Sequence, residues 1–213
     1  MLWYNDKQSD YLIIVAEMLN KLCYNINGGF MRIIAGEMRG RQLKAVEGMQ
    51  TRPTSDKVKG AIFNVLGNKV LDARVLDLFS GTGNLAIEAL SRGSREAVMV
   101  EKSMAAHQII RENLERVGVS HKAKLLLMDA FKYLDRHPQE VFDLIFLDPP
   151  YRQELVLKII LSLKEYSFLT PTGVIIAETA KDETLNEDIY PYEIRKTSEY
   201  GDTKVWYLQR TDV

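Results

Sequence analysis

The sequence of 213 residues contains very little cysteine and no long hydrophobic run. Its single cysteine, Cys23, excludes an internal disulfide and a thiolate cluster around a metal ion. The best apolar run, from Leu12 to Ala16, is far shorter than the roughly 18 residues that a membrane span needs. With 46% apolar residues and a net charge of −1, the chain predicts one large domain, or one domain with a small appendage, without a membrane segment and in a reducing compartment such as the cytoplasm.

Histidine is also scarce. The three histidines, His107, His121 and His137, share neither a close spacing nor the end of a predicted strand, so we expect surface positions and no metal site.

Residues 1–30 differ from the rest because they show no clear amphipathic repeat. Acidic residues before the apolar run argue against a signal peptide. One alternative is a short helix over 9–22 that lies on the domain. We favour Met31 as the natural start, because the codons of Gly28 and Gly29 can contain a ribosome-binding sequence just upstream of it.

Residues 31–67 form a basic segment. Between positions 32 and 59 it has seven basic and three acidic residues, a local charge of +4. Two short strands around a glycine-containing turn are expected over 32–43, followed by a helix that Thr54 or Ser55 caps and Gly67 ends. Arginines separated by glycine suit a phosphate backbone, but charge alone does not distinguish such a site from a solvated face.

Residues 68–213 alternate strand and helix. Helices are expected over 84–92, 103–117, 130–136 and 154–164, between strands at 75–79, 97–100, 124–128, 143–147 and 174–177. Two further strands, 192–198 and 204–209, are joined by a turn at Gly201 and Asp202. The alternation predicts a seven-stranded, doubly wound α/β sheet of Rossmann-like form. The terminal hairpin requires an antiparallel C-terminal strand.

Four consecutive strands end in polar or glycine-rich residues, where such a sheet binds its ligands. The loop from Gly81 to Ala86 fits G-x-G-x-x-A, and Glu101 follows at the distance expected of an acid that binds ribose hydroxyls. A nicotinamide dehydrogenase would show the same pattern. Asp77 favours S-adenosylmethionine instead, because an acid repels a pyrophosphate but attracts a cationic amino group. Asp129, after the third strand, lies where an adenine amino group is expected.

The sequence Asp148-Pro149-Pro150-Tyr151 directly follows the fourth strand. The two prolines fix the backbone and leave carbonyls pointed into the site. The Asp148 carboxylate and the Pro149 carbonyl could accept both hydrogens of an exocyclic amine, which would localise the nitrogen lone pair. The Tyr151 ring would stack on a planar base. The alternative is a proline pair that merely starts a helix.

Together these motifs resemble class I S-adenosylmethionine-dependent amino-methyltransferases. The segments 31–36, 39–41, 51–54 and 63–66 resemble more closely the RsmD family, which methylates the N2 amine of one guanine in 16S ribosomal RNA of the small subunit. The resemblance covers residues 31 to about 210, and residues 1–30 have no counterpart in the family pattern.

The resemblance implies three groups of site residues. The residues that bind the target base and catalyse the transfer would be Asp148, Pro149, Pro150 and Tyr151. The cofactor S-adenosyl-L-methionine would be held by Asp77, Phe79, Ser80, Gly81, Thr82, Gly83, Asn84, Glu101, Lys102, Asp129 and Ala130. RNA phosphates would be bound by Arg32, Arg39, Arg41 and Arg52. We expect a monomer that acts by direct in-line transfer without a metal, on 16S ribosomal RNA, the small subunit or an assembly intermediate.

Three alternatives remain. A DNA adenine-N6 methyltransferase shares the Asp-Pro-Pro-Tyr chemistry but usually needs a further recognition region. A protein glutamine methyltransferase more often has asparagine in place of Asp148. A non-catalytic RNA-binding protein could keep the fold, although the intact motifs argue against it. The role of Glu178, near the end of the fifth core strand, is left open.

Overall fold

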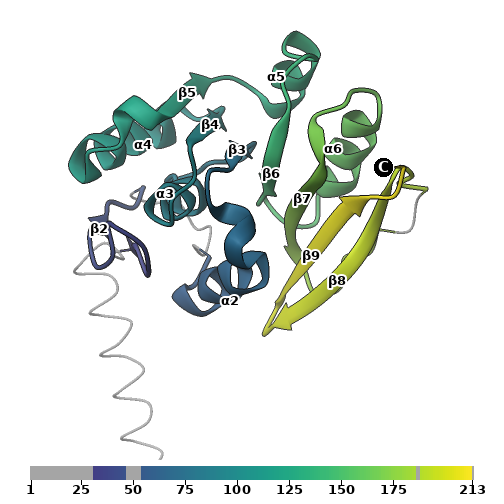
Figure 1. The fold of residues 1–213 in the computed structure, drawn as a ribbon, viewed down its shortest axis with the longest axis horizontal. Helices are drawn as coiled ribbons and strands as arrows, with labels where there is room; N and C mark the ends of the chain where they lie inside the picture. The colour runs from purple at the N-terminus through teal and green to yellow at the C-terminus, as the bar shows by residue number, and fades with distance from the viewer. Residues whose placement is uncertain (1–30, 47–53, 186–187, 213) are drawn as a thin grey trace, which may run out of the picture. The chain divides into compact units, whose positions relative to one another are not determined.

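A computed structural model describes residues 31–46, 54–185 and 188–212 (Figure 1). The expectations for residues 1–30, and those for Arg52, lie outside these ranges. Among the described residues, none of the helices is long and apolar enough to cross a membrane.

The core of the protein is a seven-stranded sheet in the order β5-β4-β3-β6-β7-β9-β8. Its strands are β3 (Arg74–Asp77), β4 (Glu96–Glu101), β5 (Ala123–Leu127), β6 (Phe142–Leu147), β7 (Leu169–Ala180), β8 (Tyr192–Tyr200) and β9 (Thr203–Arg210). The first five pair in parallel, whereas β9 runs antiparallel to both of its neighbours. The predicted sheet with its antiparallel C-terminal strand is confirmed.

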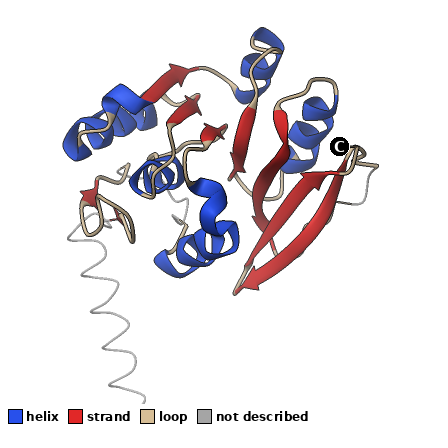
Figure 2. Ribbon diagram, viewed as in Figure 1, coloured by secondary structure: helices blue, strands red, loops and turns tan. Residues whose placement is uncertain are grey.

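Helices cover both faces of the sheet (Figure 2). One face packs against α2 (Asp56–Leu66), α3 (Asn84–Ser91) and α4 (Met104–Val117), and the other against α5 (Ala130–Arg136) and α6 (Leu155–Lys164). Two short 3-10 helices, η1 (Gly67–Val70) and η2 (Ser120–Lys122), each lead into a strand. The predicted caps Ser55, Ser103 and Gly118 are present.

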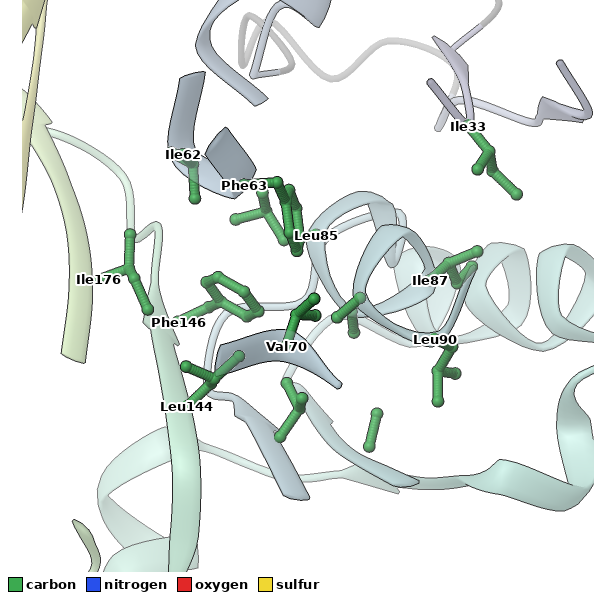
Figure 3. Close-up of a cluster of buried hydrophobic side chains, with 14 of the residues drawn as sticks. Ile33, Ile62, Phe63, Val70, Leu85, Ile87, Leu90, Leu144, Phe146 and Ile176 are labelled. Carbon is green, nitrogen blue, oxygen red and sulfur yellow. The ribbon is translucent and has the colours of Figure 1, made fainter. Parts of the chain in front are cut away.

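Alternation along the strands builds two apolar layers. Val75 of β3 faces the α2–α3–α4 side while Leu76 faces the α5–α6 side, and Leu144 and Phe146 of β6 share the side of Val75. Figure 3 shows this first layer, in which Phe63 of α2 lies against Phe146 with ring centroids 5.8 Å apart. The packing fixes α2 against the middle of the sheet.

A small hairpin of β1 (Met31–Arg32) and β2 (Gln42–Leu43) docks on the end of α3. Gly36, with φ of +84°, lies so close to Ser91 that a Cβ atom would stand 1.9 Å from the Ser91 carbonyl oxygen. The Ser91 hydroxyl donates to the Ala35 carbonyl and accepts from the Met38 amide. The predicted hairpin is confirmed, although its strands are only two residues long.

A buried ion pair joins α2, α3 and this hairpin. Lys59 and Glu88 are 1% and 0% exposed, and their charged groups lie 3.2 Å apart. Glu88 also accepts the backbone amides of Ile34 and Ala35 and the side chain of Arg92. Burial lowers the pKa of Lys59, and Glu88 opposes that shift. Every charge in this cluster therefore has a partner.

Candidate active site

Three carboxylates from neighbouring strands meet on one face of the sheet near its carboxyl edge. Asp77, Asp148 and Glu178 each lie two positions after an apolar residue of the layer that packs against α2. The register pairs Asp77 with Phe146, and Phe146 with Ile176. Because side chains alternate along a strand, the three acids follow these residues onto the same face.

Thr54, just before the cap of α2, connects two of these acids. Its hydroxyl oxygen lies 2.9 Å from Oδ2 of Asp148 and 3.1 Å from Oε1 of Glu178. The backbone carbonyl of Thr54 also accepts from Asn84. Thus α2 does more than cover the sheet, because its N-terminal end directly contacts the carboxylates.

Burial raises the pKa values of all three acids. The pKa of Asp77 rises to about 7, mainly because it is desolvated and also because Asp148 and Glu101 repel its charge. Burial raises the pKa of Asp148 to about 6, against the hydrogen bond from Thr54. The pKa of Glu178 lies well above its ordinary value because of burial and of Asp148. Strongly shifted carboxylates in one cluster are typical of functional sites.

Asp77 has an unsatisfied buried oxygen. It is 2% exposed, and its Oδ1 atom has no hydrogen-bond partner among the described residues. A desolvated acceptor of this kind suits a positively charged donor. The observation fits the predicted attraction of Asp77 to the amino group of S-adenosylmethionine.

The glycine loop after β3 is bound to the end of β4. Oε2 of Glu101 accepts the Gly81 amide at 2.8 Å, and Oε1 accepts the Ser103 amide at 2.7 Å. The carboxylate therefore fixes the loop, and its remaining lone pairs can accept from ribose hydroxyls. Gly83 takes φ of +81°, and a Cβ there would stand 2.8 Å from the Met99 side chain. Because glycine has no Cβ atom, α3 can pack closely behind the loop.

The other predicted cofactor residues divide by environment. Ser80 is buried and its hydroxyl donates to the Asp77 carbonyl, whereas Asn84 is buried and accepts from Lys59. The Ser80 side chain is bonded to the backbone of its own loop, and the Asn84 side chain connects α3 to Lys59 of α2. Phe79 and Thr82 are half-buried in the loop, and Lys102 is exposed after β4.

Asp129 lies after β5 and caps α5. Its Oδ1 atom accepts the amides of Phe131 and Lys132, while Ala130 is the first residue of the helix and is buried. The other carboxylate oxygen, Oδ2, is left for the predicted contact with an adenine amino group.

The four residues of the Asp-Pro-Pro-Tyr segment differ in their exposure to solvent. Pro149 is buried and Pro150 exposed, whereas Asp148 is half-buried and Tyr151 is 38% exposed. The Tyr151 hydroxyl lies 3.3 Å from that of Thr203 at the start of β9. Burial raises the pKa of Tyr151 to about 12, so the phenol stays neutral. An aromatic face held by its hydroxyl end beside a carboxylate can receive a planar amine.

The arginines of the basic hairpin are exposed, but two of them have partners within the protein. Arg32 pairs with Asp56 at 2.7 Å on the surface, and the Arg41 guanidinium donates to the Val117 carbonyl at the end of α4. Arg39 is exposed in the turn. An exposed ion pair such as that of Arg32 with Asp56 contributes little to stability. Arg32 can therefore leave Asp56 and bind a phosphate instead.

Sequence reasoning missed Thr54 as a site residue and left Glu178 open. Thr54 was expected only as a possible cap, but Ser55 caps α2. The signal for Glu178 was its spacing from the apolar run of β7, which becomes informative only with the register against β6. Within the described ranges no group of three or more potential ligands could hold a metal ion.

The sheet order, with the reversed strand β9, defines a Rossmann-like methyltransferase fold. A solved candidate methyltransferase of Escherichia coli, yhhF, superposes with a TM-score of 0.77 at 30% identity, covering 85% of this chain and 98% of that one. The family model described as Conserved hypothetical protein 95 matches residues 31–209. The chain belongs to this family, and the resemblance seen in the motifs is confirmed.

The names of several relatives state a function, and two of these relatives serve as examples. A candidate ribosomal RNA methyltransferase of Bacillus subtilis, YlbH, is 38% identical over 177 residues, which cover 82% of this chain and 96% of the relative. Ribosomal RNA small subunit methyltransferase D of Haemophilus influenzae is 36% identical over 160 residues, covering 74% and 82%.

Proposed function

We propose that this protein transfers a methyl group from S-adenosylmethionine to the exocyclic N2 amine of a guanine in 16S ribosomal RNA. The observation that carries the proposal is the half-buried Asp148, with Tyr151 three residues on, beside the unsatisfied oxygen of Asp77. The names of the relatives support ribosomal RNA as the substrate.

The acidic cluster favours a cationic ligand. S-adenosylmethionine, when bound, supplies a methyl group on a positively charged sulfur. Asp77 would bind its amino group, Glu101 its ribose and Asp129 its adenine. Each of these acids keeps acceptor capacity for that contact.

The amine would be activated by acceptors rather than by a strong base. Asp148 and the Pro149 carbonyl would accept its hydrogens, so that they aim the lone pair and stabilise the positive charge that develops on nitrogen. Tyr151 would hold the base by stacking. The Asp-Pro-Pro-Tyr segment thus supplies both orientation and electrostatic stabilisation.

We propose that residues 31–67 contact RNA phosphates, through Arg39 and, on exchange of their internal partners, Arg32 and Arg41, with Arg52 as a further contact. Residues 68–213 would form the catalytic domain. The protein would act as a monomer in the cytoplasm, where small subunits are assembled.

The test is methyl transfer from labelled S-adenosylmethionine to unmodified small subunits, naked ribosomal RNA, duplex DNA and total protein, followed by identification of the modified residue. N2-methylguanine in ribosomal RNA supports the proposal. N6-methyladenine would instead identify DNA as the substrate, and methylglutamine would identify a protein. If the protein did not bind the cofactor, a non-catalytic RNA-binding function would be favoured.

Variants separate the roles. Asp148→Ala should reduce turnover far more than cofactor affinity, whereas Asp135→Ala, at an exposed position of α5, should change neither. Tyr151→Ala should weaken the step that involves the base, and Glu101→Ala should instead raise the cofactor Kd. If Tyr151→Ala and Glu101→Ala each changed turnover and the cofactor Kd equally, these separate roles would be wrong.

A further inference from the structure

The Thr54 hydroxyl contacts two acids but has one hydrogen. Oγ1 lies 2.9 Å from Oδ2 of Asp148 and 3.1 Å from Oε1 of Glu178. A hydroxyl donates one hydrogen bond, so only one of these carboxyl oxygens can be its acceptor. The second contact requires a proton on the other carboxyl group, which then donates to Thr54.

Burial decides which acid holds that proton. Glu178 is 2% exposed within β7, flanked by β6 and β9, whereas Asp148 is half-buried at the end of β6. Desolvation penalises the ionised form of the more deeply buried group. The pKa of Glu178 lies well above its ordinary value, while that of Asp148 is about 6. Glu178 is therefore the neutral partner.

The groups around this pair do not neutralise its charge. Tyr151 and Tyr207 face Glu178, and burial raises the pKa of both phenols. Asp77 lies beside Asp148 and is itself acidic. Among the described residues, no lysine or arginine forms an ion pair with Asp148 or Glu178. Two ionised carboxylates here would repel each other without a nearby cation.

We propose that Thr54 and Glu178 are positioning residues for methyl transfer: neutral Glu178 donates to Thr54, and Thr54 donates to Oδ2 of Asp148. This chain of hydrogen bonds keeps Asp148 ionised and fixes its carboxylate, so that Oδ1 is left for the target amine. The role rests on the function proposed above. It also explains a buried glutamate that the transfer does not otherwise use.

Substitutions at Glu178 and Thr54 give opposite expectations. Glutamine retains a donor toward Thr54, so Glu178→Gln should keep turnover within about threefold of the wild type, like a protonated glutamate. Thr54→Val removes the donor to Asp148, so kcat should fall about tenfold or more while KM changes little.

The pH profile of turnover separates positioning from packing. The hydrogen bond from Thr54 lowers the pKa of Asp148. Without it the pKa rises, and the acidic limb of the profile should move upward by about one pH unit in Thr54→Val. Thr54→Ser, which restores the hydroxyl, should return both kcat and the limb toward the wild type. A merely structural contact would leave the limb in place.

Infrared difference spectroscopy supplies a readout without turnover. At neutral pH the wild type minus Glu178→Gln spectrum should contain the carbonyl band of a protonated carboxyl group. Three results would overturn the inference while the wild type still transfers methyl groups. They are the absence of that band, an acidic limb of the pH profile that does not move in Thr54→Val, and a loss of kcat in Glu178→Gln as large as that in Thr54→Val. Failure of the wild type to methylate any RNA would instead overturn the proposed function.

Discussion

Removing the charge of Asp77 should stabilise the fold at neutral and alkaline pH. The side chain is buried, and its Oδ1 has no partner among the described residues. Desolvation, together with repulsion from Asp148 and Glu101, raises its pKa from 3.8 to about 7. The ionised form is therefore disfavoured in the folded protein relative to the unfolded chain.

The sign and size follow from proton linkage. Between about pH 4 and pH 7 the folded state holds the Asp77 proton while the unfolded chain has released it, so stability falls as pH rises. Each pKa unit is worth about 1.4 kcal/mol, and the shift from 3.8 to about 7 corresponds to about 4 kcal/mol above pH 7. Because asparagine does not ionise, the free energy of unfolding of Asp77→Asn does not include this decrease.

Urea unfolding of both proteins at several pH values measures the effect. The stability of Asp77→Asn relative to the wild type should increase by about 4 kcal/mol between about pH 4 and pH 8. Asp135→Asn, exposed on α5, is the matched control and should show no such trend. A relative stability of Asp77→Asn that does not change with pH would refute the assigned origin of the shift.

The same variant should lose cofactor affinity. Only ionised Asp77 attracts the protonated amino group, so wild-type binding of S-adenosylmethionine should be about fivefold weaker at pH 6 than at pH 7, given an Asp77 pKa of about 7. Calorimetry should find weak binding by Asp77→Asn that does not vary with pH over this range. Tight binding by the variant would contradict the contact.

Three further predictions concern the supports of the site. Glu88→Gln should cost about 3–5 kcal/mol in urea unfolding, because it leaves the 1% exposed Lys59 ammonium without its ionised partner. Gly83→Ala should lower stability by about 1–3 kcal/mol, since φ of +81° and a Cβ at 2.8 Å from Met99 are both unfavourable. Arg39→Ala should leave thermal unfolding unchanged but weaken RNA binding and reduce its salt slope by about 1; an unchanged slope would exclude a phosphate contact there.

The order of the secondary structure was predictable because its local signals are strong. Ser103 and Gly118 bound α4 as capping chemistry predicts, and the apolar runs of the parallel strands follow from burial on both faces. The extent of β7 was not predictable. It runs from Leu169 to Ala180, although Pro171 and Gly173 interrupt the apolar pattern of its first half, because Leu169 pairs with Phe142 across an irregular register.

The residues of the candidate site could be selected from the sequence where they directly follow strands. Asp77, Glu101 and Asp148 end or follow strands that motif spacing identifies. The contacts of Thr54 depend instead on the packing of α2, and those of Glu178 on the strand register; Thr54 and Glu178 are 124 residues apart in the chain. Local sequence contains neither relationship. Tertiary geometry therefore adds the partners of Asp148 to the candidate site that the motifs indicate.

Two clusters of buried charge in this protein differ in how fully their carboxylates are hydrogen-bonded, and the difference favours a functional role for the acidic edge. Glu88 is as deeply buried as Asp77, but it accepts two backbone amides and contacts both Lys59 and Arg92. Asp77 keeps an oxygen without a partner and has a raised pKa. The fold satisfies a buried carboxylate fully where structure requires it. On the proposed function, a cationic ligand would satisfy the unpartnered acceptor at the carboxyl edge, and the stability that Asp77 costs the free protein would contribute to the binding energy of the complex.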